Sequence, residues 1–114
     1  MWNDDSAIME SCIASVLEEG RYDWIMGAEL ASIIMEISGT KSPGVVRSLA
    51  LSVIGALLSR GLAEIGDVLA GRGFVPWGGD SGANLDRASR EWPAVRAPGL
   101  GEGGWLRVLS DGRA

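Results

Sequence analysis

Residues 27–65 decide the fold of this chain, and they read GAELASIIMEISGTKSPGVVRSLALSVIGALLSRGLAEI. Apolar residues at helical spacing predict an amphipathic helix from about Ala28 to Ile37. Ser42 is a favourable N-cap for a second helix, which starts with a proline, stops at a glycine and is expected over Pro43–Arg60. A short turn, residues 38–41, joins the two helices.

The flanking sequence adds one helix and three short strands. Apolar spacing and acidic cap residues predict a helix from about Asp5 to Glu19, ended by a glycine. Short apolar segments predict strands over Trp24–Met26, Leu62–Ile65 and Trp105–Leu109. The chain is therefore expected to form one α+β domain, residues 1–114, with three main helices and a small antiparallel sheet.

A glycine-rich insertion, about residues 66–104, separates the last two strands. The proline within Phe74–Trp77 excludes a central strand there. Asn84 is the expected N-cap of a short helix that ends before a proline. Trp77 and Trp92 are expected to be largely buried and to anchor the insertion, because ordering a glycine-rich segment costs much chain entropy and needs packed side chains to offset it.

The order of these elements resembles the winged helix-turn-helix fold. Two helices joined by a short glycine-containing turn match the helix-turn-helix unit, and the two later strands match the wing. The resemblance lies in Tyr22–Ile37, Ser42–Ile65 and Trp105–Leu109, and the insertion replaces a tight wing hairpin. Short segments look like those of small bacterial proteins of this type: Gly73–Trp77, Glu91–Trp92 and Gly104–Leu106. The resemblance implies a winged-helix-like bacterial protein with an expanded wing, and it brings no established activity.

Composition excludes several classes of chemistry. The 114 residues include no histidine and one cysteine, Cys12, which is expected to be buried. Imidazole bases, Cys/His zinc sites, histidine-containing triads and internal disulfides are therefore excluded. The acidic first residues do not match a secretory signal, and no apolar run reaches the ~20 residues of a membrane span, so a cytoplasmic location is expected.

Two glycine-containing segments imitate nucleotide-binding motifs without the structural context of those motifs. Gly39–Ser42 ends like a P-loop, but a helix rather than a strand precedes it. Gly99–Gly104 spells G-x-G-x-x-G, but a proline precedes it and a strand follows it. The acidic residues do not have the regular spacing of a calcium-binding loop. We therefore expect no cofactor and no metal ion.

Charge is distributed unevenly along the chain, whose formal net charge is -5. Residues 1–40 hold eight acidic residues and one basic residue, and the remainder is slightly basic. The face of the Pro43–Arg60 helix opposite its core side carries only small residues: Ser48, Ser52, Gly55 and Ser59. Base readout favours longer polar side chains, whereas small residues permit the close approach of another helix. The candidate protein interface is this face together with Glu18 and Glu19.

These observations predict a non-enzymatic protein-interaction module that binds a basic protein or a second copy of itself, and immunity and antitoxin proteins are one such class. The alternative is a winged-helix DNA-binding transcriptional regulator that uses Lys41 and Arg47 and arginines of the insertion. The acidic N-terminal part disfavours specific binding to duplex DNA, because phosphates dominate DNA affinity. An enzyme, the third hypothesis, needs a pocket that joins Asp80 or Glu91 to an arginine.

Overall fold

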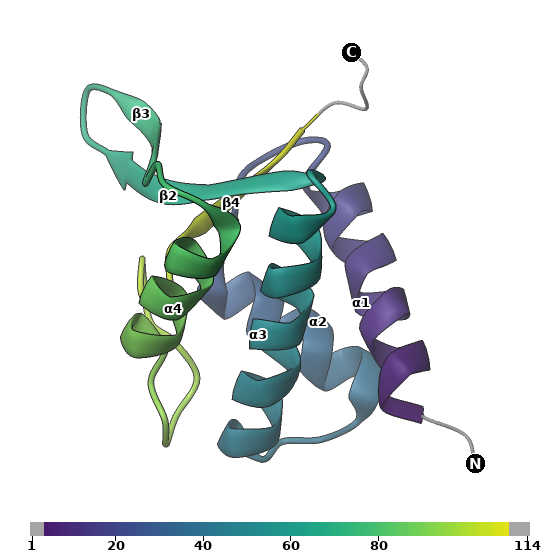
Figure 1. Ribbon diagram of the computed structural model, residues 1–114. Helices are drawn as coiled ribbons and strands as arrows, with labels where there is room; N and C mark the ends of the chain where they lie inside the picture. The colour runs from purple at the N-terminus through teal and green to yellow at the C-terminus, as the bar shows by residue number, and fades with distance from the viewer. Residues whose placement is uncertain (1–3, 110–114) are drawn as a thin grey trace.

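The computed structural model describes residues 4–109 (Figure 1). Its helices are α1 (Asp4–Glu19), α2 (Gly27–Ser38), α3 (Pro43–Ser59) and α4 (Ser81–Glu91). Its strands are β1 (Ile25–Met26), β2 (Ala63–Leu69), β3 (Gly73–Pro76) and β4 (Trp105–Val108). Figure 1 shows α3 at the centre, with α1 on one side, α4 on the other and the sheet across their upper ends.

Local capping contacts set the ends of α2 and α3. α2 ends at Gly39, which adopts a positive φ of 78° and donates its N–H to the Met35 carbonyl oxygen at 2.9 Å. α3 begins after Ser42, whose side chain accepts the N–H of Val45 at 3.5 Å. The predicted bounds of both helices are confirmed to within one residue. Among the described residues no single helix is long and apolar enough to span a membrane, and α2 and α3 pass that test only together, with a bend of 107° between them.

The four strands form an antiparallel sheet in the order β1-β4-β2-β3. β4 is last in the sequence but lies between β1 and β2, so that Leu106 pairs with Ile25 on one side and with Ile65 on the other. All three side chains are buried in the core, which makes this the inner face of the sheet. β1 and β4 are each one residue shorter than predicted. Trp24 lies just before β1, and Leu109 lies just after β4.

The structure corrects the prediction within the insertion. Residues 4–109 contain the three main helices and, as a fourth, the short helix expected in the insertion, but α4 extends over 11 residues and starts earlier than predicted. The N-cap of α4 is Asp80, whose carboxylate accepts the N–H of Ala83 at 2.8 Å, and Asn84 lies inside the helix. β2 extends over Ala63–Leu69 rather than the predicted Leu62–Ile65, and its longer end forms a hairpin with β3. β3 ends with a proline and lies at the sheet edge, where a proline is tolerated.

The core lies where α1, α2 and α3 meet the inner face of the sheet. The predicted apolar face of α3 is buried in full: Val46, Leu49, Ala50, Val53, Ile54 and Leu57. Cys12 of α1 is fully buried, as predicted, and burial raises the pKa of its thiol. Trp92 joins the core from the end of α4 and is 3% exposed, which confirms the prediction for this residue. Trp77 is only half-buried and packs against the edge of the core.

Candidate functional site

The small residues of α3 do not share one open surface. Gly55 lies beneath α4, because a side-chain carbon added there would lie 3.2 Å from Leu85. Ser48 and Ser52 instead line a groove of about 700 Å³ between α1 and α3, whose lining side chains within residues 6–109 carry no charge. Ser59 is exposed near the end of the helix. The predicted interface on this helix is thus divided between a part covered by α4 and a groove between α1 and α3.

Arg47, one of the two predicted nucleic-acid contacts, makes a contact within the fold instead. Its Nη2 donates to the Ser89 carbonyl oxygen in the last turn of α4 at 2.7 Å, and its Nε is buried without a hydrogen-bond partner. A cation at this position interacts favourably with the last carbonyl groups of a helix. Arg47 therefore holds α4 against α3. Lys41, the other predicted contact, is exposed in the α2–α3 turn.

Carboxylates of the same chain neutralise most of the other arginines. The ion pairs among residues 6–109 are Arg21–Glu18, Arg60–Glu10, Arg87–Asp67, Arg87–Glu91, Arg90–Asp86, Arg96–Glu102 and Arg107–Glu64. Within that range, Lys41 and Arg72 are the cationic side chains with neither a carboxylate nor a carbonyl partner. They belong to the α2–α3 turn and the β2–β3 hairpin, which lie at opposite ends of the molecule in Figure 1.

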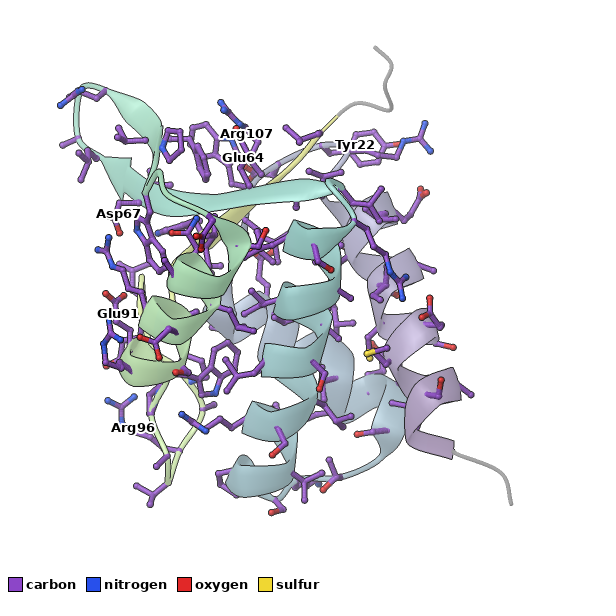
Figure 2. The ribbon with its side chains drawn as sticks, viewed as in Figure 1. Tyr22, Glu64, Asp67, Glu91, Arg96 and Arg107 are labelled. Atoms are coloured by element: carbon purple, nitrogen blue, oxygen red, sulfur yellow. The ribbon has the colours of Figure 1, made fainter. Side chains whose placement is uncertain are left out.

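The carboxylates considered for an enzyme have structural partners. Asp80 caps α4. Glu91 accepts the Nε–H of Arg87 at 2.9 Å, and Arg87 also lies 3.5 Å from Asp67 and 3.9 Å above the centre of the Trp77 ring. Figure 2 shows Asp67 and Glu91 along the outer side of α4. These contacts tie α4 to β2 and thereby hold the insertion in place.

The outer face of the sheet is covered by contacts among its own side chains. Arg107 pairs with Glu64 directly across β4 and β2 and lies 4.6 Å above the Phe74 ring. The ring of Trp24 packs against Phe74 at a centroid distance of 6.0 Å. Figure 2 shows Glu64 and Arg107 on the side of the sheet away from the helices. Arg107 is therefore already bound on this face.

Carboxylates that lack an ion-pair partner are concentrated between the end of α1 and the end of α2. Within residues 6–109, the acidic side chains without an ion pair are Glu19, Asp23, Glu29 and Glu36 in this segment and Asp80 outside it. Asp23 and Glu29 accept only backbone N–H groups, at 2.8 and 3.1 Å. This segment therefore carries most of the unneutralised negative charge of the described side chains.

Three of these carboxylates surround one hollow, here named the acidic groove. It has a volume of about 390 Å³ and is lined by Glu19, Met26, Ala28, Glu29, Ser32, Ile33 and Glu36. The sequence-based prediction includes Glu19 but omits Glu29 and Glu36. Glu29, Ile33 and Glu36 are spaced at i, i+4 and i+7, which indicates that these three residues share one face of the helix. Glu18, the other predicted acidic residue, pairs with Arg21 at 3.3 Å.

An ion pair closes the segment that follows α4, here named the 93–104 loop. Arg96 donates from its two Nη atoms to the two carboxylate oxygens of Glu102 at 2.6 and 2.9 Å. Glu102 also accepts the backbone N–H of Gly99 at 2.8 Å. The hydrogen bonds from Arg96 and then from Gly99 lower the pKa of Glu102 from 4.5 to about 2.

We expect this ion pair to break only in strong acid. Because folding lowers the pKa of Glu102, the pair contributes stability that is complete above pH 4.5 and is lost as the pH falls toward about 2. An NMR titration of the Glu102 side-chain carboxyl carbon should therefore have its midpoint well below 4.5. In the wild type the Gly99 amide signal should shift with the same midpoint, because this N–H donates to Glu102. In the Glu102→Gln variant that shift should be absent. A midpoint near 4.5 would contradict the two-pronged contact.

The described residues include no group of three or more Cys, Asp or Glu side chains placed to hold a metal ion. No protein-family model matches this chain, and neither the curated proteins nor the solved structures show a significant similarity to it. Its function is therefore inferred from the geometry and charge of its own residues.

Proposed function

We propose that this chain is a non-enzymatic protein-interaction module that binds a basic segment of a partner protein in the acidic groove. The distribution of unpaired charge carries this proposal: three carboxylates without ion-pair partners surround one groove, whereas most described arginines are bound within the chain. Complementary charge speeds association and selects among partners more than it adds affinity. A protein that covers a basic toxin is one class with this requirement.

The proposal includes a winged-helix arrangement with an expanded wing. It is supported by the α2–turn–α3 unit, by β1 before it and β2 after it, and by the return of β4 between those two strands. In this arrangement β3 and α4 take the place of the wing hairpin. Since α4 covers α3 at Gly55, that side of α3 is not free to enter a DNA major groove.

The charges favour a basic protein over nucleic acid or a second copy of the chain. Phosphate contacts by Lys and Arg dominate DNA affinity, but Arg47 is bonded to the Ser89 carbonyl oxygen. Lys41 and Arg72, the unpartnered cations among the described side chains, belong to distant segments. A second copy carries the same acidic groove, so two such grooves repel each other. A cationic partner is consistent with the bonded Arg47, with the wide separation of Lys41 and Arg72, and with the negative charge of the groove.

Neutralising the groove should weaken the binding of a cationic partner. The probe is an amphipathic helical peptide of lysine and leucine, titrated by calorimetry and by stopped-flow association. The double variant Glu29→Gln, Glu36→Gln should weaken binding about tenfold, mainly through slower association, and should lower the salt dependence. The matched control, Asp86→Asn with Glu91→Gln on α4, removes the same formal charge and should change affinity less than about twofold.

Equal weakening by the two double variants would contradict the proposal, because it would show that the peptide is attracted by net charge alone.

Crosslinking tests directly whether the peptide binds in the acidic groove or in the groove between α1 and α3. A photoreactive residue at position 32 lies in the acidic groove and should join to the peptide, whereas one at position 48 lies between α1 and α3 and should not. Tight, sequence-selective binding of duplex DNA at about 150 mM salt would instead support the regulator.

A further inference from the structure

We infer that the 93–104 loop is the second half of the same docking surface, where Val95 and Leu100 contact apolar side chains of the basic segment bound in the acidic groove. This inference rests on the proposed function, because it assigns a second contact to the same partner. The partner segment then needs two features: lysine or arginine side chains over the groove and apolar side chains beside the loop.

Val95 and Leu100 are the most exposed large apolar side chains among residues 6–109, at 83% and 81%. Tyr22 follows at 78%, and the next, Val45, is 47% exposed. Removing such side chains from water is favourable in proportion to the apolar area that is buried. Two of them on one short loop therefore concentrate this gain at a single place.

The residues next to Val95 and Leu100 are held by the ion pair and hydrogen bonds of the loop. Val95 directly precedes Arg96, and Leu100 lies between Gly99 and Glu102, so each is next to a residue of the ion-paired cluster. Figure 2 shows Arg96 on this loop, below α4. A loop that is ordered before binding loses less conformational entropy on binding than a free one. The ion pair thus favours the use of this loop as a contact surface.

The loop adjoins the acidic groove at Gly27, the first residue of α2. A side-chain carbon added to Gly27 would lie 2.6 Å from the Glu102 carbonyl oxygen and 3.3 Å from the Pro98 ring. Gly27 is flanked in the chain by Met26 and Ala28, which both line the acidic groove. The part of the loop around Pro98 and Glu102 therefore packs against the start of α2, beside two residues that line the acidic groove.

The chemistry of the surface selects an amphipathic cationic segment of a protein. Arg96 and Glu102 neutralise each other, so the contribution of the loop is apolar. The acidic groove combines three carboxylates with the apolar side chains of Met26, Ala28 and Ile33. A helix with basic residues on one side and apolar residues on the other matches both parts. An anionic lipid surface does not, because the carboxylates would repel it.

The test titrates the same lysine–leucine peptide against loop variants of the full chain. Val95→Ala with Leu100→Ala should weaken binding about tenfold without changing its salt dependence, since no charge is removed. Arg96→Gln with Glu102→Gln removes the ion pair at constant net charge and should weaken binding about threefold. The control Leu69→Ala truncates an exposed leucine at the end of β2 and should leave binding unchanged.

The outcomes separate this inference from the proposed function. If Glu29→Gln with Glu36→Gln weakens binding while the Val95 and Leu100 variant binds like the wild type, the loop inference is overturned and the proposed function stands. If the wild type does not bind the peptide, both fail. A peptide with serine in place of leucine should bind the wild type and the loop variant equally, and a difference between them would also overturn the inference. Circular dichroism and the unfolding midpoint verify that each variant is folded.

Discussion

Replacing Trp92 by alanine should lower the free energy of unfolding by about 3–5 kcal/mol, as for other buried large aromatic side chains. Trp92 is 3% exposed and belongs to the main core, although it follows α4 in the insertion. Its ring also packs on Gly103, where an added side-chain carbon would lie 2.8 Å from it. The truncation therefore removes core contacts and the anchor of the 93–104 loop together. Urea unfolding followed by circular dichroism measures the loss.

Tyr22→Ala is the matched control, because its ring is 78% exposed. The substitution should change the free energy of unfolding by no more than about 0.5 kcal/mol. Proteolysis of folded Trp92→Ala should also become faster within the 93–104 loop, since one of its anchors is gone. A loss below about 1 kcal/mol for Trp92→Ala would show that other contacts hold the insertion to the core.

The helices are predictable from the sequence wherever local capping residues set their ends. Ser42 and Gly39 act through hydrogen bonds to residues three and four positions away, so their effect on α2 and α3 can be read directly from the sequence. The start of α4 is predicted wrongly, because Asp80 and Asn84 are both favourable N-caps. Which of the two caps the helix depends on the position of the chain after the β2–β3 hairpin, and the folded sheet sets that position.

The candidate site is less predictable, because contacts between residues far apart in the sequence decide which charged side chains are neutralised. Arg60 pairs with Glu10 and Arg107 with Glu64, across 50 and 43 positions of sequence. Counted along the sequence, both arginines make the second part of the chain basic. In the fold they are neutralised, and so are the carboxylates that bind them. The acidic groove becomes recognisable only when these paired carboxylates are set aside, a step that needs the tertiary structure.

Replacing Gly66 by alanine should destabilise the protein by about 2–3 kcal/mol, because it overpacks a site with no free space. Gly66 lies within β2 and pairs with Pro76 of β3 on one side and Trp105 of β4 on the other. An added side-chain carbon would lie 2.2 Å from the Val75 carbonyl oxygen and 2.8 Å from the Pro76 Cα. Both are backbone atoms, so no side-chain rotation relieves the contact and β3 must move away from β2. Gly66, which directly follows the predicted strand Leu62–Ile65, is therefore required inside the observed strand.

Gly44→Ala is the matched control for Gly66→Ala, because it adds the same carbon where, apart from the adjoining residues and the helix's own backbone, no atom of the described residues lies within 4 Å. Gly44 is in the first turn of α3, and alanine there should be neutral or stabilise the protein by up to about 1 kcal/mol. The difference between the two variants isolates the close approach of β3 to β2. The movement of β3 should also change the NMR signals of the Trp24 ring, since that ring packs against Phe74 of β3. Equal unfolding free energies for the two variants would contradict the described crossing of β3 over Gly66.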